Sequence, residues 1–329
     1  VWYQGRAVLR GPGNQLQVFQ DQGQYWDAWN IAPDYEQHPL DGFRLLDWQW
    51  LAWGPVRSHL RVIRCFQAST FTQDYILEAG SGVLKIATEV DWRETQVMVK
   101  ANFPLNLTAD QVITEMACGA IARPTRPQTA AEQAKWEIPA HRWADLSDGA
   151  WGVSLLNDCK YGYDAGPNHL RLTLLRSPLW PDPGSDRCND TDPYRHRFTY
   201  ALYPHPGTWQ EARTVQLGYN LNHPPVCLPF TPSSDPVLPP MGSLLTLGGD
   251  NLVLMALKPS EADSQTVILR AYEAHGKTAA LTLGGLIPLG TPERRNILEM
   301  PMEGNTTLTP WQIATFALSL PELTPFNAP

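Results

Sequence analysis

Residues 84–92 read Leu-Lys-Ile-Ala-Thr-Glu-Val-Asp-Trp, with large apolar side chains mostly at alternate positions. A period of two places alternate side chains on one buried face of an antiparallel sheet. Similar alternation recurs along the chain, at residues 14–20, 58–66, 73–78, 168–175 and 196–203. Many strands with few helices between them predict a β-sandwich rather than a parallel α/β sheet.

Turn-forming residues support this prediction. The chain contains 30 prolines and 24 glycines, so few segments of more than about ten residues lack a breaker. Such a density suits strands joined by turns and opposes a helical bundle. One short helix is expected after Thr129, because Thr129 and Glu132 form a capping-box pattern that Pro139 soon follows.

Proline also marks a boundary between two domains. Residues 229–240 read Pro-Phe-Thr-Pro-Ser-Ser-Asp-Pro-Val-Leu-Pro-Pro, a composition that favours an extended, semi-rigid linker. More strand-like runs follow this stretch. We therefore predict a large β domain over residues 1–228, a linker over 229–240 and a small β domain over 241–329.

Composition excludes several classes of function. The net charge of −8 and the lack of a basic run argue against nucleic-acid binding. No apolar run approaches the roughly 20 residues that cross a bilayer, so no membrane partner is expected. The 5 cysteines are widely spaced without a Cys-x-x-Cys pair. Free thiols in a reducing compartment fit this pattern, which favours a cytoplasmic location.

Residue types and spacing alone do not reveal an active site. The sequence has no His-x-x-x-His, Gly-x-Ser-x-Gly or phosphate-loop motif, and the acidic run 182–192 lacks the order of a calcium loop. There are 13 tryptophans, and residues 23–30 read Gly-Gln-Tyr-Trp-Asp-Ala-Trp-Asn. Tryptophan faces suit sugar rings, but they also fill sandwich cores. These patterns indicate an acidic, Trp-rich β protein and leave both roles open.

Longer motifs add a family resemblance. Residues 19–30, 142–164 and 172–205 together resemble the C-terminal β region of α-mannosidases of glycoside hydrolase family 38, most closely the cytosolic and bacterial branch. Residues 269–276, Leu-Arg-Ala-Tyr-Glu-Ala-His-Gly, resemble that branch's final small domain. The resemblance implies an all-β fold: a large antiparallel β-sandwich of the galactose-mutarotase-like super-sandwich type, followed by a small C-terminal β-sandwich.

The resemblance also implies what this chain lacks. In the family, an N-terminal catalytic domain carries the nucleophile, the acid/base carboxylate and the zinc ligands. We therefore expect no catalytic or metal-binding residue here, and zinc or a similar divalent metal in the missing domain. The chain is interpreted as a C-terminal fragment of a retaining α-mannosidase, starting inside its first β domain and inactive alone. Its expected partners are its own catalytic domain, a mannose-containing oligosaccharide and a second copy of the chain.

Several residues are expected near the sugar pocket of such an enzyme. The loop at residues 181–188 resembles a family loop whose arginine reaches the pocket, although Cys188 replaces the usual glycine and residues 189–194 look inserted. Residues 23–30 are expected at the seam with the catalytic domain. The substrate-pocket candidates are Arg187, Asp186, Asp27, Trp26, Trp29, Asp158 and Tyr161.

Two other classes of function remain open at this point. The chain could be a free-standing, lectin-like carbohydrate-binding module, which binding of mannose to the isolated chain would reveal. It could instead be a mutarotase-like enzyme, which needs a histidine and a carboxylate facing one groove. His196 and His205 flank one predicted strand and are the residues that would test the second alternative.

Overall fold

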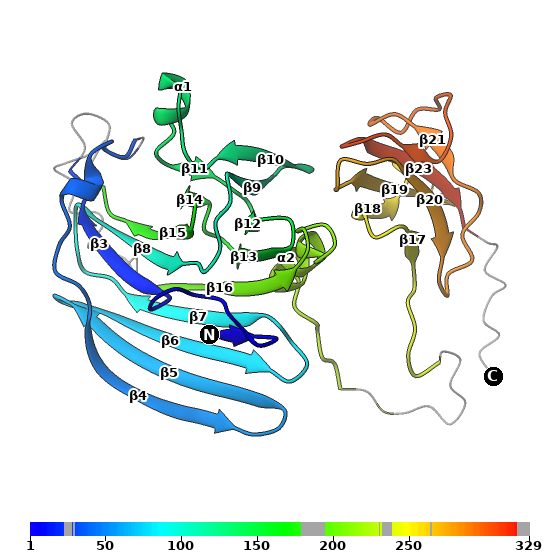
Figure 1. The fold of residues 1–329 in the computed structure, drawn as a ribbon. Coiled ribbons are helices and arrows are strands. Elements are labelled where there is room, and N and C mark those ends of the chain that lie inside the picture. The colour runs from blue at the N-terminus through cyan, green and yellow to red at the C-terminus, as the bar shows by residue number, and fades with distance from the viewer. Residues whose placement is uncertain are drawn as a thin grey trace. The chain divides into compact units, whose positions relative to one another are not determined.

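The computed structural model describes residues 1–22, 28, 30–178, 195–229, 231, 239–263 and 265–320. Within these residues the chain is nearly all β, as predicted, and it divides into two compact units (Figure 1). Unit 1 comprises residues 1–116 and 121–224, and unit 2 comprises residues 117–120 and 225–329. Among the described helices, none has the length and apolar character that crossing a membrane requires.

A nine-stranded sheet forms one layer of unit 1, in the order β10-β9-β12-β13-β16-β7-β6-β5-β4. Neighbouring strands from β9 to β4 run antiparallel. The strands are β4 (Arg44–Trp53), β5 (Arg57–Phe66), β6 (Ser69–Glu78), β7 (Leu84–Asp91), β9 (Gln111–Met116), β10 (Gly119–Pro124), β12 (Trp143–Ser147), β13 (Trp151–Asn157) and β16 (Arg195–Pro206).

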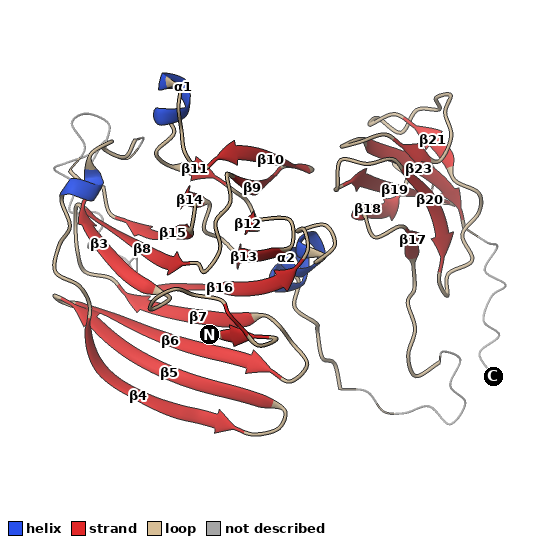
Figure 2. Cartoon of the chain, viewed as in Figure 1, coloured by secondary structure: helices blue, strands red, loops and turns tan. Residues whose placement is uncertain are grey.

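A five-stranded antiparallel sheet forms the second layer, in the order β11-β14-β15-β8-β3. Its strands are β3 (Gln15–Gln20), β8 (Val97–Pro104), β11 (Ile138–Pro139), β14 (Gly162–Gly166) and β15 (His169–Arg176). A small hairpin joins β1 (Trp2–Tyr3) to β2 (Arg6–Ala7), and the only helical turn between β3 and β4 in the described residues is η1 (Tyr35–Gln37). Figure 2 shows how few helices accompany these strands.

The main core lies between the two sheets. Ile86 and Val90 of β7 are buried in it beside Val99 of β8 and Leu172 of β15. Strand β7 pairs with β6 and β16, so the strand predicted from the alternation at residues 84–92 is confirmed. The apolar face of that strand points to the five-stranded layer, as a period of two requires.

The sequence predicts one of the two described α-helices and not the other. Helix α1 (Ala130–Gln133) follows Thr129, and the predicted capping box with Glu132 is present. Helix α2 (Thr214–Asn222) was not predicted, because it has no side-chain cap and carries a glycine. It is held by packing: a Cβ added at Gly218 would lie 3.1 Å from Trp143 of β12, so the glycine permits the close approach.

Unit 2 has two small sheets, ordered β17-β20-β22 and β18-β19-β23-β21. Leu269, Phe316 and Leu318 lie in its own apolar core. Its strands are β17 (Thr246–Gly248), β18 (Leu252–Pro259), β19 (Thr266–Glu273), β20 (Ala279–Gly284), β21 (Glu293–Arg295), β22 (Thr307–Leu308) and β23 (Ile313–Ser319). The prediction of a second, smaller β fold after the proline-rich stretch agrees with this unit.

Candidate functional site

One buried ion pair brings together the ends of the two segments that contain most of the predicted site residues. Asp21 follows β3, and Arg176 ends β15. The Arg176 guanidinium donates to both carboxylate oxygens of Asp21, at 2.7 and 3.0 Å, and to the carbonyl oxygen of Asn30 at 3.0 Å. Residues 21 and 30 therefore meet the residue that precedes the segment 177–194.

We call the contact between Asp21 and Arg176 the junction, and hydrogen bonds of the surrounding backbone strengthen it. The amide of Asp21 donates to the carbonyl of Gln96 (2.7 Å), and the amide of Gln96 donates to the carbonyl of Ser177 (2.7 Å). The Asp21 side chain is fully buried, so its charge depends on Arg176 for compensation. Loss of one partner from such a pair leaves a buried, uncompensated charge. The junction therefore joins described residues that flank both predicted segments in the sequence.

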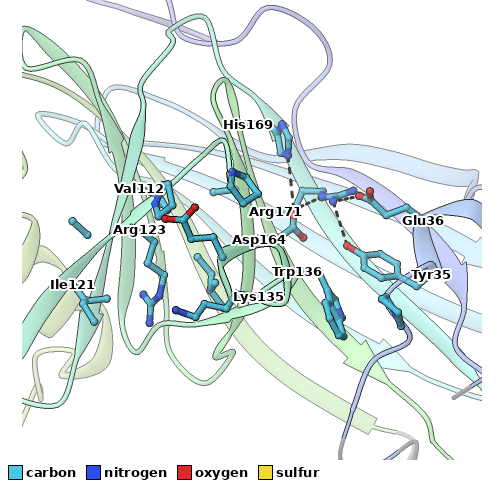
Figure 3. Close-up of a pocket in the computed structure, with 17 residues that line it drawn as sticks. Tyr35, Glu36, Val112, Ile121, Arg123, Lys135, Trp136, Asp164, His169 and Arg171 are labelled. Atoms are coloured by element: carbon cyan, nitrogen blue, oxygen red, sulfur yellow. Dashed lines mark hydrogen bonds and ion pairs between the residues drawn. The ribbon is translucent and has the colours of Figure 1, made fainter. Parts of the chain in front are cut away.

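A pocket opens beside this junction, where β14 and β15 of the five-stranded sheet meet residues of η1, β10 and α1 (Figure 3). Trp136 connects the two features, because its indole N–H donates to the carbonyl of Ile31 at 3.1 Å. Under the pocket, Phe19, Tyr35 and Met98 form a small apolar cluster. The cavity has a volume of about 430 Å³. Its polar lining residues include Glu36, Arg123, Glu132, Lys135, Asp164, His169 and Arg171.

Arg171 and Lys100 organise the charges at the base of the pocket. The Arg171 guanidinium donates to Asp164 at 2.6 Å and to the Tyr35 hydroxyl at 3.2 Å, and it pairs with Glu36 (Figure 3). The fully buried Lys100 ammonium donates to Asp164 at 2.5 Å and also pairs with Glu137. The carboxylates at the base of the pocket are therefore shared between two cations.

These pairs shift the protonation equilibria in opposite directions. Burial alone would raise the pKa of Asp164, but Lys100, His169 and Arg171 outweigh it and hold that pKa well below its usual range. Burial would likewise lower the pKa of Lys100, but the carboxylates of Asp164 and Glu137 hold it above its usual value. Burial raises the pKa of Glu137. Asp164 and Lys100 are thus charged over the whole physiological range.

The carboxylates at the base of the pocket do not have the arrangement that glycosidases use. Glycosidases act through one carboxylate free to attack or activate water and one carboxylic acid that donates a proton. Here the base carboxylates are already engaged by Lys100 and Arg171. At the opposite wall, Arg123 hydrogen-bonds Thr114 and makes no ion pair with a described residue, and burial lowers its pKa. A half-buried indole and a lone guanidinium suit a small polar ligand.

The structure describes two of the predicted site residues. Asp158 follows β13, and its carboxylate accepts the amide of Thr199 at 2.8 Å, which ties the turn after β13 to β16. Tyr161 is 55 % exposed and contacts the ring of His141 edge-on at 5.8 Å between centroids. Neither residue lines the pocket of Figure 3. The candidates Trp26, Asp27, Trp29, Asp186 and Arg187 lie outside the described residues.

The two histidines of the mutarotase alternative do not face one groove. His196 and His205 both belong to β16, but the offset between their positions along the strand, nine residues, is odd, so their side chains lie on opposite faces of the sheet. His205 is fully buried, 2.8 Å from Asp145 and 3.3 Å from the Ser154 hydroxyl. This trio resembles a hydrolase triad in composition, but it lies inside the protein beneath α2, where no substrate can reach it.

Sequence reasoning missed the charged cluster of Lys100, Glu137, Asp164 and Arg171. One signal was available: Lys100 interrupts the apolar run Val-Met-Val-Lys-Ala-Asn-Phe at residues 97–103. A lysine in the middle of a buried strand needs a carboxylate partner. The partners lie 37 and 64 residues away in the chain, so the sequence could not identify them.

Comparison with known proteins extends these observations. The family model described as "Glycosyl hydrolases family 38 C-terminal domain" matches residues 3–184, and the model "Glycosyl hydrolases family 38 C-terminal beta sandwich domain" matches residues 251–316. Human "Alpha-mannosidase 2C1" is 34 % identical over 330 residues, which cover 95 % of this chain and 31 % of the relative. "Alpha-mannosidase G" of Dictyostelium discoideum is 31 % identical over 277 residues, covering 80 % and 24 % of the two chains.

A solved structure shows the same fold. The crystal structure of an α-mannosidase from Enterococcus faecalis V583 superposes with a TM-score of 0.73 at 14 % identity, covering 93 % of this chain and 38 % of that one. At this level of identity the likeness concerns the fold alone. The chain spans about a third of the length of the curated relatives it matches.

Proposed function

This chain belongs to glycosyl hydrolase family 38, and we propose that it is the C-terminal β part of a retaining α-mannosidase that hydrolyses terminal α-linked mannose. The observation that carries the proposal is the alignment with human "Alpha-mannosidase 2C1", which covers 95 % of this chain but 31 % of the relative. The remaining length of the relative offers room for a catalytic region upstream.

In the proposed enzyme, the chemistry belongs to that upstream region. A carboxylate there attacks the anomeric carbon, a second carboxyl group protonates the leaving oxygen, and water then hydrolyses the glycosyl-enzyme. Zinc or a similar metal, held by upstream ligands, would bind sugar hydroxyls. Within the described part of this chain, no three His, Cys, Asp or Glu side chains are grouped as metal ligands. In this proposal the metal site belongs to the upstream region.

This part of the enzyme would serve as scaffold and as one wall of the active site. The Asp21–Arg176 junction supports this role, because in the sequence it flanks both segments that carry Trp26, Asp27, Trp29, Asp186 and Arg187. A guanidinium at position 187 could hold sugar hydroxyls in a fixed geometry. Asp158 keeps a structural role in the proposal, since its carboxylate holds a turn. We place the enzyme in the cytoplasm, acting on mannose-containing oligosaccharides.

Activity measurements test the proposal directly. The polypeptide encoded by the complete reading frame is expected to cleave an aryl α-mannoside, with NMR showing α-mannose as the first product. The 329-residue chain alone is expected to be inactive. Arg187→Lys in the complete protein should reduce kcat/KM roughly 10-fold or more, because lysine cannot reproduce the fork of donors. An active isolated chain, or a β first product, would refute the proposal.

The pocket beside Trp136 favours a second candidate function, sugar binding by the isolated chain. The indole of Trp136 would stack on the face of a sugar ring, and the Arg123 guanidinium would bind the hydroxyls of the same ring. Calorimetry with mannose and manno-oligosaccharides would detect such binding. A micromolar Kd that Arg123→Ala abolishes would establish a lectin-like module, whereas the absence of heat would leave the scaffold role.

A further inference from the structure

Strand β4 carries an unusual surface for the edge of a sheet. Its sequence is Arg-Leu-Leu-Asp-Trp-Gln-Trp-Leu-Ala-Trp, and nine of its ten residues are exposed. The register with β5 sets Trp48 opposite the buried Val62 and Trp50 opposite Leu60, on the side of the sheet that bears the main core. We call the exposed apolar side chains on this side of β4 and β6 the β4 face: Leu45, Trp48, Trp50, Trp53 and Leu77.

The β4 face is large and uncovered in the described chain. The exposed fractions of Trp48, Trp50 and Trp53 are 57, 47 and 74 %. At the size of a tryptophan side chain, these three residues alone present roughly 300–400 Å² of apolar surface. A continuous patch of this size on one protein is typical of an interaction site. Figure 1 shows β4 at the end of the nine-stranded sheet that is farthest from β10.

The form of the strand favours contact through its side chains rather than through its backbone edge. The pairing of β4 with β5 shifts register twice, between Leu45 and Asp47 and between Trp50 and Ala52. Bulges of this kind twist an edge and hinder the addition of another strand. The side chains across from the tryptophans, Leu60 and Val62, are also apolar. The partner must therefore present an apolar surface of its own.

Sugar binding fits the β4 face poorly. Sugar sites combine an aromatic platform with polar groups that converge on the hydroxyls. Several polar side chains on this side of the sheet are engaged with one another: Arg64 donates to Gln73 at 2.5 Å, and Asn14 donates to the Tyr75 hydroxyl at 2.6 Å. An apolar protein surface would bury the tryptophan side chains and would not require free polar groups beside them.

We infer that the β4 face is the docking surface for the upstream catalytic region of the same polypeptide. The inference rests on the proposed function, in which two thirds of the enzyme's length lies outside this chain. An upstream region tethered to this chain meets the face at high effective concentration, which a second copy does not. Docking through tryptophans would hold the catalytic region against the sandwich that carries the predicted pocket wall.

Hydroxyl-radical footprinting of the complete protein and of the 329-residue chain tests this inference. Oxidation of the peptide 44–53 is expected to fall about 10-fold in the complete protein at a concentration where it is monomeric. In the complete protein, the double substitution Trp50→Ser and Trp53→Ser should weaken docking. Limited proteolysis should then separate the upstream region from this chain faster than in the unaltered protein. Trp2→Ser is the matched control, because Trp2 is as exposed as Trp53 (74 %) but lies in the β1–β2 hairpin.

Several outcomes would overturn the inference. Equal oxidation of β4 in both proteins would show that no upstream segment covers it. Protection of the isolated chain that grows with concentration would assign the face to a second copy, and protection by mannose would assign it to a sugar. Mannosidase activity is read separately: an inactive protein with a protected β4 refutes the proposed function and leaves the docking surface standing.

Discussion

Strands β13 and β4 belong to the same sheet, yet all seven residues of β13 are buried and nine of the ten in β4 are exposed. Both are rich in apolar residues. Strand β13 has the five-stranded layer on one side and α2 on the other, where Ser154 hydrogen-bonds Thr214 at 2.8 Å. Strand β4 has no such cover among the described residues. Burial in this protein therefore depends on what lies over a strand, and not on its apolar content.

The largest expected effect is on stability and concerns Lys100, a charged side chain that is fully buried in the covered part of unit 1. Lys100→Ala should destabilise unit 1 by about 3–5 kcal/mol, because Glu137, whose side chain is 17 % exposed, would lose the one cation that it pairs with among the described residues. Lys85→Ala is the control: its ammonium lies 3.5 Å from Glu78 in a half-exposed pair, so its loss should cost about 0–1 kcal/mol. Denaturant unfolding followed by tryptophan fluorescence measures both.

A second substitution distinguishes charge from packing at the same position. Glu137→Gln added to Lys100→Ala should restore part of the lost stability, because the stranded carboxylate is then removed. If the double variant is less stable than Lys100→Ala alone, the ion pair is not the source of the loss. The stability lost in Lys100→Ala would then come from the loss of side-chain packing around β8.

A matched pair of leucines compares the two strands directly. Leu155→Ala in β13 removes a fully buried side chain and should cost about 2–4 kcal/mol. Leu45→Ala in β4 removes one that is 54 % exposed and should cost less than about 0.5 kcal/mol in this chain. Equal losses would mean that β4 is covered in solution, and a loss that depends on protein concentration would identify a second copy as the cover.

The same comparison explains which features the sequence predicts. Alternation predicts β7, because its residues meet one buried and one less buried face. Strand β4 was not predicted: apolar residues occupy both parities and two bulges interrupt its register. Helix α2 lacks a capping signal. The all-β class and the family came from local patterns and long motifs, which the sequence contains in full.

The charged sites could not be predicted because their partners are distant in the chain. Arg176 and Asp21 are 155 residues apart, and Arg171 and Glu36 are 135 apart. A single sequence carries no information on which strands become neighbours across such separations. The roles of Trp26, Asp27 and Arg187 remain predictions, because these residues lie outside the described part of the chain.

The smallest expected effect concerns His196, near the start of β16. This residue is half-buried, and so it is intermediate between the buried residues of β13 and the exposed residues of β4. Burial lowers its pKa, and the nearby Lys160 lowers it further. The unfolded chain therefore binds more protons than the folded one as pH falls through the ordinary histidine value of about 6.5. The histidine contributes a stability that is complete above that pH and is lost as pH falls towards its folded pKa.

Other groups also titrate in this range, so the contribution of His196 is read as a difference. The unfolding midpoint should fall less between pH 7.5 and 5.5 in His196→Asn than in the unaltered chain. His38→Asn serves as a control, because His38 is an exposed residue whose ring lies 3.4 Å from the exposed Asp34 carboxylate. An unchanged pH dependence in His196→Asn would show that the start of β16 is open to water.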